Sequence, residues 1–254
     1  WCIVMHRLIS IMIYIASIGL VWKALVWLFQ IPHFILPAPE RVLMTAFERA
    51  PQLLHHGSTT LAEIVAGLCL GALLGFSTAC LLSISGRLQR AAMPLLIVSQ
   101  ALPVFALAPI LMLWLGYGFA SKLAMTTLIV YFPVTAATLS GFRACPLSWE
   151  DTFHTLHARR WNLFWIVRVP MALPHTLSGL RIAASVAPIG GVVGEWIGSS
   201  SGLGYLMLHA NGRGQTDLMF AALLLLCLEA LLVWTVVNRL SRRFDHHMPT
   251  GSVS

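Results

Sequence analysis

The sequence predicts an all-α integral membrane protein with about six transmembrane helices, because of its composition and its long uncharged runs. Of its 254 residues, 58% are hydrophobic and only 10% are charged, and the mean hydropathy is +0.81. A soluble globular domain carries roughly 25% charged residues. A soluble protein of this composition would need a very large core inside a very small polar shell, so we exclude that class.

Each predicted span is a stretch of about 20 mostly apolar residues, the length that crosses the hydrocarbon core of a bilayer. In chain order these stretches are 8–30, 64–86, 91–121, 123–142, 174–199 and 218–238. The third is too long for one straight helix and contains Pro94, Pro103 and Pro109. We therefore expect an entry turn and a kinked helix there.

The placement of basic residues predicts that both termini lie in the cytoplasm, because short cytoplasmic loops carry an excess of Lys and Arg. With the N-terminus inside, the outer loops hold only Arg41, Arg49, Lys122 and Arg213. The cytoplasmic side then holds Arg7, Arg87, Arg90, Arg143, Arg159, Arg160, Arg168, Arg239, Arg242 and Arg243. These residues are spread between apolar runs, so the net charge of +7 indicates membrane topology and no nucleic-acid partner.

Two outer segments have patterns of their own. Residues 37–56 predict a short amphipathic surface helix whose apolar face carries Val42, Ala46 and Leu53. Residues 199–215 predict a Gly- and Ser-rich loop, in which the glycines allow a tight return of the chain.

Charged side chains inside spans point to function, because a charge in the bilayer usually faces the bundle interior or water. Glu195 lies near the outer end of the fifth span, where it either makes a structural hydrogen bond or snorkels to the surface. Glu229 is in the middle of the sixth span. It meets its symmetry mate, pairs with Lys23, or stays protonated.

A broken polar stretch inside the third span, Ser99, Gln100 and Pro103, is a candidate lining of a translocation pathway. The alternative is a proline kink packed against its neighbours. In the second span, small residues at positions 67, 71 and 75 favour close contact between helices.

The longest polar stretch between spans is 143–168, on the predicted cytoplasmic side. Trp149, Phe153 and Leu156 recur at helical spacing, which predicts an amphipathic helix below the membrane. Such a helix either fills a partner's groove or packs on headgroups and on its own bundle.

Within this stretch, residues 151–157 (DTFHTLH) and 167–170 (VRVP) resemble the permease signature of binding-protein-dependent ABC importers. Asp151, Val167, Val169 and Pro170 fit that signature in type and spacing. Further pieces are similar to the subgroup for nitrate, sulfonates, taurine and thiamine-precursor pyrimidines: LPAP at 36–39, VGE at 193–195 and SSGLGY at 200–205. The likeness extends from about residue 36 to residue 243.

This resemblance implies a type I ABC importer permease fold in the bacterial cytoplasmic (inner) membrane, with a cytoplasmic coupling helix at about 149–163. It implies a homodimeric channel that works with a separate ABC ATPase subunit and a soluble substrate-binding protein. The expected organisation is an N-terminal transmembrane helix (1–35), a permease domain (36–243) and a C-terminal tail (244–254).

The expected site residues fall into two groups. Those expected to contact the ATPase are Glu150, Asp151, Thr152, Phe153, Leu156, His157, Ala158 and Pro170. Those expected along the pathway or gate are Ser99, Gln100, Pro103, Glu195 and Glu229. His157 stands where the signature has Gly and Phe153 where it has a small residue, so the segment bends differently or couples more weakly.

The chain itself is expected to be no enzyme, with no catalytic residue, metal or cofactor. No Walker A pattern occurs in the sequence, so ATP is expected on the partner subunit. The alternatives are an ion- or proton-coupled carrier that uses Glu195 and Glu229, and an intramembrane enzyme. Residues 187–196 and 206–211 look most like permeases for hydroxymethylpyrimidine-type thiamine precursors, and this resemblance implies a solute of that type.

Overall fold

The computed structural model describes residues 2–101, 103–145 and 160–245, and within these ranges the chain forms helices and turns without a β-strand. Four described helical stretches are long and apolar enough to cross a membrane: Ala50–Ser83, Phe119–Arg143, Trp161–Gly198 and Thr216–Phe244. This confirms the predicted all-α membrane class.

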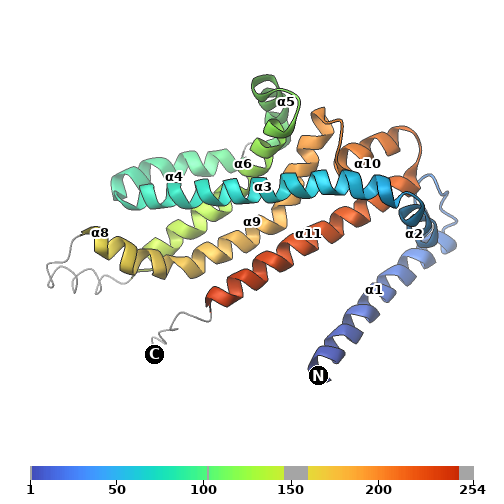
Figure 1. Cartoon of the computed structure of the whole chain (residues 1–254), viewed down its shortest axis with the longest axis horizontal. Helices are drawn as coiled ribbons and strands as arrows, with labels where there is room; N and C mark the ends of the chain where they lie inside the picture. Colours follow the sequence, from blue (N-terminus) through green and yellow to red (C-terminus); the bar gives the residue numbers. More distant parts are fainter. Residues whose placement is uncertain (1, 102, 146–159, 246–254) are drawn as a thin grey trace.

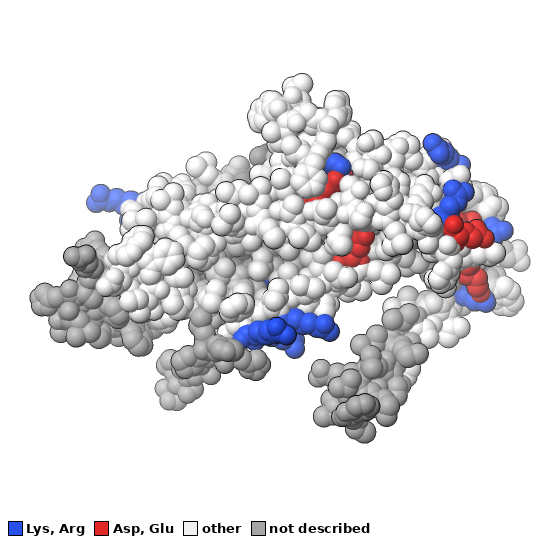
Figure 2. Space-filling model, viewed as in Figure 1, with Lys and Arg blue, Asp and Glu red and all other residues white. Residues whose placement is uncertain are grey.

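The bundle consists of α3 (Ala50–Ser83), α6 (Phe119–Arg143), α9 (Val169–Gly198) and α11 (Thr216–Asp245) (Figure 1). We call one end of it the α10 end: α3, α6 and α11 begin there, and α9 ends there. The opposite end, where α9 begins, is called the α8 end. Figure 2 shows that the visible Lys and Arg residues gather mainly toward the ends and margins of the molecule, as expected for a helix bundle in lipid.

The predicted kinked third span is in fact two helices, which corrects that prediction. The first is α4 (Gly86–Ala101), and the second is α5 (Val104–Leu115). Pro103 caps α5 in an extended conformation, with φ −62° and ψ 114°. Proline lacks an N–H and disfavours helical backbone in the preceding residue, so the chain changes direction there instead of bending within one helix.

The N-terminal segment lies beside the bundle. Helix α1 (Cys2–Leu28) extends away from it (Figure 1), and its Trp22 ring lies 5.8 Å from that of Phe220. The expected surface helix exists as α2 (Pro39–Glu48), with Val42 buried. It is shorter than predicted, because the chain turns at Arg49 and α3 then begins.

The remaining elements join α6 to α9 and α9 to α11. Between α6 and α9 lie the short α8 (Arg160–Leu163) and the π-helical turn η1 (Phe164–Arg168), and α10 (Leu203–Gly212) precedes α11. Helix α9 begins earlier than the predicted fifth span and continues through Pro174 and Pro188.

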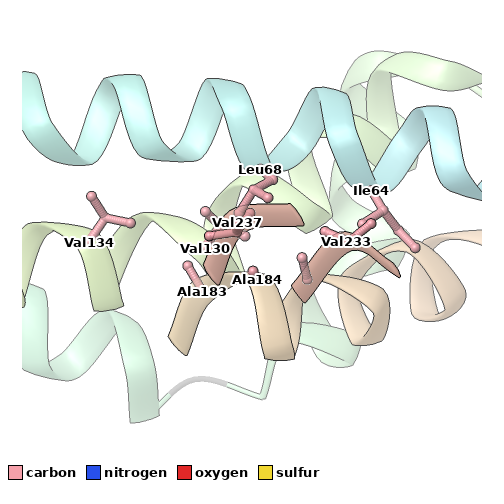
Figure 3. Close-up of a cluster of buried hydrophobic side chains, with 9 residues drawn as sticks. Ile64, Leu68, Val130, Val134, Ala183, Ala184, Val233 and Val237 are labelled. Carbon is pink, nitrogen blue, oxygen red and sulfur yellow. The ribbon is translucent and has the colours of Figure 1, made fainter. Parts of the chain in front are cut away.

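Close packing holds the four bundle helices together. A Cβ atom on Gly67 would lie 2.4 Å from the Cβ of Thr126, and one on Gly71 would lie 2.7 Å from Val130. The predicted small-residue contact is therefore the interface between α3 and α6. A cluster at the centre of the bundle draws side chains from all four helices (Figure 3): Ile64, Leu68, Val130, Val134, Ala183, Ala184, Ala187, Val233 and Val237.

Candidate functional site

A charged cluster lies inside the bundle, toward the α10 end. Lys122 of α6 forms an ion pair with Glu63 of α3, and both side chains are almost fully enclosed, at 5% and 0% exposure. Glu195 of α9 is 1% exposed, and its carboxyl group lies beside that of Glu63. Buried charges persist only when they are paired and hydrogen-bonded. The cluster thus ties three of the four bundle helices together through polar contacts.

Glu195 fastens the chain after α9 to α3. The Thr60 hydroxyl donates a hydrogen bond to Glu195 Oε1 (2.6 Å) and accepts one from the Leu203 N–H (2.7 Å). The other carboxylate oxygen, Oε2, accepts a hydrogen bond from the Gly204 N–H. These contacts satisfy two backbone donors in the first turn of α10, which have no partner within their own helix.

Two further contacts hold the same loop. The Gly202 N–H donates to His56 Nδ1 (3.1 Å), and the Lys122 ammonium donates to the Ser199 hydroxyl (3.0 Å). We call residues 199–204, with the hydrogen bonds that join them to Thr60, His56, Lys122 and Glu195, the latch.

Only glycine fits at position 202 of the latch. Its φ is +112°, and a Cβ atom there would lie 2.1 Å from Glu195 Cδ. The absence of a side chain lets the backbone cross directly over the Glu195 carboxyl group. The loop makes the expected tight turn, and the backbone of that turn packs against the Glu195 carboxyl group.

A cavity of about 490 Å³ opens beside the ion pair, between α3, the turn that precedes α6, and the latch. We call it the polar cavity. Its lining comprises Thr59, Glu63, Tyr117, Gly118, Phe119, Lys122, Gly198, Ser199, Ser200 and Ser201.

Glu229 lies apart from these contacts, within α11. Its side chain is 9% exposed, and a Cβ atom on Gly57 of α3 would lie 2.6 Å from Glu229 Oε1. Among the described residues, Glu229 Oε2 has no hydrogen-bond partner. Lys23, which was one suggested partner, forms an exposed ion pair with Glu40 instead, and this pair lowers the pKa of the Glu40 carboxyl.

The other expected pathway residues are not part of the latch. Ser99 and Gln100 are in the last turn of α4, and Pro103 is exposed where α5 begins. Of the residues predicted to contact an ATPase, Pro170 lies in the first turn of α9. The others lie outside the described residues and stay predictions: Glu150, Asp151, Thr152, Phe153, Leu156, His157 and Ala158.

Sequence reasoning identified Glu195 but missed three of its neighbours. It treated Lys122 as an outer-loop charge and did not single out Glu63 or Thr60. The available signal was a lone acid in α3 and a lone base at the start of α6, each followed by a long apolar run. Nothing in the sequence indicates that these two charges meet, because 59 residues separate them.

Comparisons with known proteins agree with this architecture. Residues 67–248 match the family described as "Binding-protein-dependent transport system inner membrane component". The chain is 49% identical over 238 residues to a probable ABC transporter permease of Haemophilus influenzae, covering 94% of this chain and 97% of that protein. It is 39% identical over 212 residues to a formylaminopyrimidine transport permease of Halalkalibacterium halodurans, covering 82% and 83%.

A similar fold occurs among solved structures. An inward-facing structure of the MetNI methionine ABC transporter superposes with a TM-score of 0.68 at 17% sequence identity. The superposition covers 78% of this chain and 98% of that one. At this level of identity the likeness establishes the fold alone.

Proposed function

Since the chain belongs to the family of binding-protein-dependent transport system inner membrane components, we propose that it forms, as a homodimer, the channel of an importer for an aminopyrimidine. The family makes it an integral inner-membrane protein and the permease subunit of an ABC importer. The latch supports this proposal, because a gate requires contacts at one end of the bundle that can be made and released.

In this proposal the α10 end faces outward and both termini face the cytoplasm. Arg87, Arg90 and Arg143 lie at the α8 end, and Arg239 and Arg242 lie in the last turns of α11. Their position supports this orientation, since cytoplasmic loops concentrate Lys and Arg.

The energy for transport comes from a separate ATPase subunit at the α8 end. The segment 149–163 is its proposed contact, through Glu150, Asp151, Phe153, Leu156 and their neighbours. Pro170 lies in the first turn of the helix that ends at the latch, since α9 runs from Val169 to Gly198. If the ATPase moves segment 149–163, helix α9 can carry that displacement to Glu195.

The latch is the proposed outer gate, and we take the described set of hydrogen bonds as its closed form. A loaded binding protein docks at the α10 end, and ATP binding below favours a second arrangement in which the latch is released. Each ligand shifts the equilibrium only by its difference in affinity for the two arrangements. Hydrolysis of ATP then restores the closed latch.

The proposed solute is a small uncharged pyrimidine that carries an amine, of the hydroxymethylpyrimidine type. Support comes from the 39% identity with a permease named for formylaminopyrimidine transport. Nitrate, sulfonates and taurine, which the sequence resemblance also suggests, are the competing solutes.

The test is ATP-dependent uptake by the complete importer in proteoliposomes, with its ATPase and binding protein. Labelled 4-amino-5-hydroxymethyl-2-methylpyrimidine is expected to accumulate, and taurine and nitrate are not. Replacing Phe153 and Leu156 with Asp is expected to abolish uptake and ATPase binding, whereas Phe153→Leu and Leu156→Met preserve both. Uptake by the chain alone without ATP would contradict the proposal and favour a carrier that uses Glu195 and Glu229.

A further inference from the structure

The polar cavity combines a charged floor with an aromatic rim. Glu63 and Lys122 lie at its floor, and Tyr117 and Phe119 at its rim are 83% and 48% exposed. Its volume of about 490 Å³ is within the range of roughly 300–1,000 Å³ that small-molecule sites occupy. Exposed aromatic faces beside hydrogen-bonding groups suit a planar ring with polar substituents.

The charges beneath the cavity leave no surplus positive charge for an anion. Two carboxyl groups, those of Glu63 and Glu195, lie around the one ammonium group of Lys122. That ammonium already donates to Glu63 and to Ser199. An anionic solute would have to draw Lys122 away and leave a buried carboxylate unpaired, which is strongly unfavourable.

The pair beneath the cavity contains an enclosed acceptor that release of the latch would expose. Oxygen Oε2 of Glu63 is buried beside the Glu195 carboxyl group and has no hydrogen-bond partner among the described residues. A carboxylate oxygen accepts from N–H groups, so an amine on the solute supplies the missing donor. The charge balance and the free acceptor together favour an uncharged, amine-bearing ring over nitrate, sulfonates or taurine.

We propose that the polar cavity is a solute-binding site of the permease itself, which takes a planar, uncharged heteroaromatic amine through the Glu63–Lys122 pair. The inference rests on the proposed function, because it places the transported solute in this cavity. Ser199 belongs to the latch and accepts a hydrogen bond from Lys122, so release of the latch uncovers the pair. Solute binding and gate opening are thereby linked.

Gly118 provides a way to fill the cavity without disturbing its floor. It lines the cavity, its φ of 164° is extended backbone that other residues adopt, and nothing lies within 4 Å of a Cβ atom built there. Gly118→Leu therefore puts a side chain at the entrance. Gly212→Leu is the matched control, because Gly212 also has open space but lies at the far end of α10.

The test is saturation-transfer-difference NMR on the permease–ATPase complex in lipid nanodiscs, without the binding protein. The probes are 4-amino-5-hydroxymethyl-2-methylpyrimidine, its analogue without the 4-amino group, and taurine. The complex carries Thr60→Val, which loosens the latch. The aminopyrimidine is expected to give a signal, and the analogue is expected to bind about tenfold more weakly or worse for want of its donor. Gly118→Leu abolishes the signal, Gly212→Leu keeps it, and taurine gives none.

The inference is overturned if the aminopyrimidine gives no signal, or if Gly118→Leu leaves its signal unchanged. It is also overturned if taurine gives an equal signal. Uptake by the unsubstituted complete importer separates this failure from failure of the proposed function. If that importer accumulates the aminopyrimidine while the NMR result is negative, the cavity site is wrong and the function stands. If it accumulates taurine or nitrate instead, the proposed solute is wrong and the cavity site falls with it.

Discussion

The two ends of the bundle are held together by different forces. At the α10 end, directional hydrogen bonds and an ion pair fasten the latch to α3 and α6. Among the described residues of the α8 end, Phe164 stacks on Phe142 with ring centroids 5.6 Å apart, and apolar residues of α3, α4, α6 and α9 pack around them. A second cavity, of about 680 Å³, lies there between α3 and the segment formed by α8 and η1, beside Trp161, Trp165 and Arg168.

This difference indicates what each end is suited to do. A set of hydrogen bonds is either made or broken, so the latch is suited to a gate that switches between two arrangements. Packed aromatic side chains move as a body and transmit displacement, so the α8 end suits contact with a motor subunit. Substitutions at the two ends should therefore differ in the size and in the kind of effect they produce.

The largest effect is expected from Lys122→Met, which leaves the buried Glu63 carboxyl group without its partner. Breaking a buried pair by removing one partner costs roughly 3–5 kcal/mol. Thermal unfolding in detergent should show a large fall in Tm. Lys23→Met is the control, because it removes the same charge from an exposed pair, and its Tm should hardly change. Equal losses in the two variants would contradict the role of the buried pair.

Thr60→Val is expected to have the next largest effect. It removes the hydroxyl that joins Glu195 to the Leu203 N–H, and an unsatisfied buried polar group costs about 1–3 kcal/mol. We expect a lower Tm and, if the latch is the outer gate, faster ATP hydrolysis in the absence of the binding protein.

The control for this change is Thr59→Val, one position away. Among the described residues, the Thr59 hydroxyl bonds to the carbonyl of His55 within its own helix and not to the latch, so its loss should leave the Tm and the resting ATPase rate nearly unchanged. If both threonine variants behave alike, the hydrogen bonds of the latch do not set the gate.

Sequence reasoning found the parts of this fold that depend on local pattern. The apolar runs around Ile64 and Val130 identify the spans, and Pro103 identifies the break before α5, although the two separate helices were not foreseen. The latch was out of reach, because it depends on pairs such as Thr60 and Glu195 that are 135 residues apart. Only the packed bundle brings such residues together. Glu195 could be identified from the sequence because a charged residue inside a span is energetically costly in lipid.

The smallest stability effect is expected at the α8 end, from Phe164→Leu. An aromatic pair contributes about 0.5–1.5 kcal/mol beyond its buried area, so the Tm should fall only slightly. The number of solute molecules carried per ATP should fall, while the resting ATPase rate stays low because the latch is intact. Ile166→Leu, at a 64% exposed position of the same turn, is the control and should change neither quantity. A raised resting ATPase rate in Phe164→Leu would show that the two ends are not separable.

The most direct test of the gate is hydrogen–deuterium exchange at the latch in the unsubstituted importer with its loaded binding protein. The amides of Gly202, Leu203 and Gly204 donate to His56, Thr60 and Glu195, so they should exchange slowly without nucleotide. When ATP is trapped on a hydrolysis-deficient ATPase, their exchange should become fast, because release of the latch frees all three. Exchange that is fast in both states, or equally slow in both, would contradict the assignment of the latch as the outer gate.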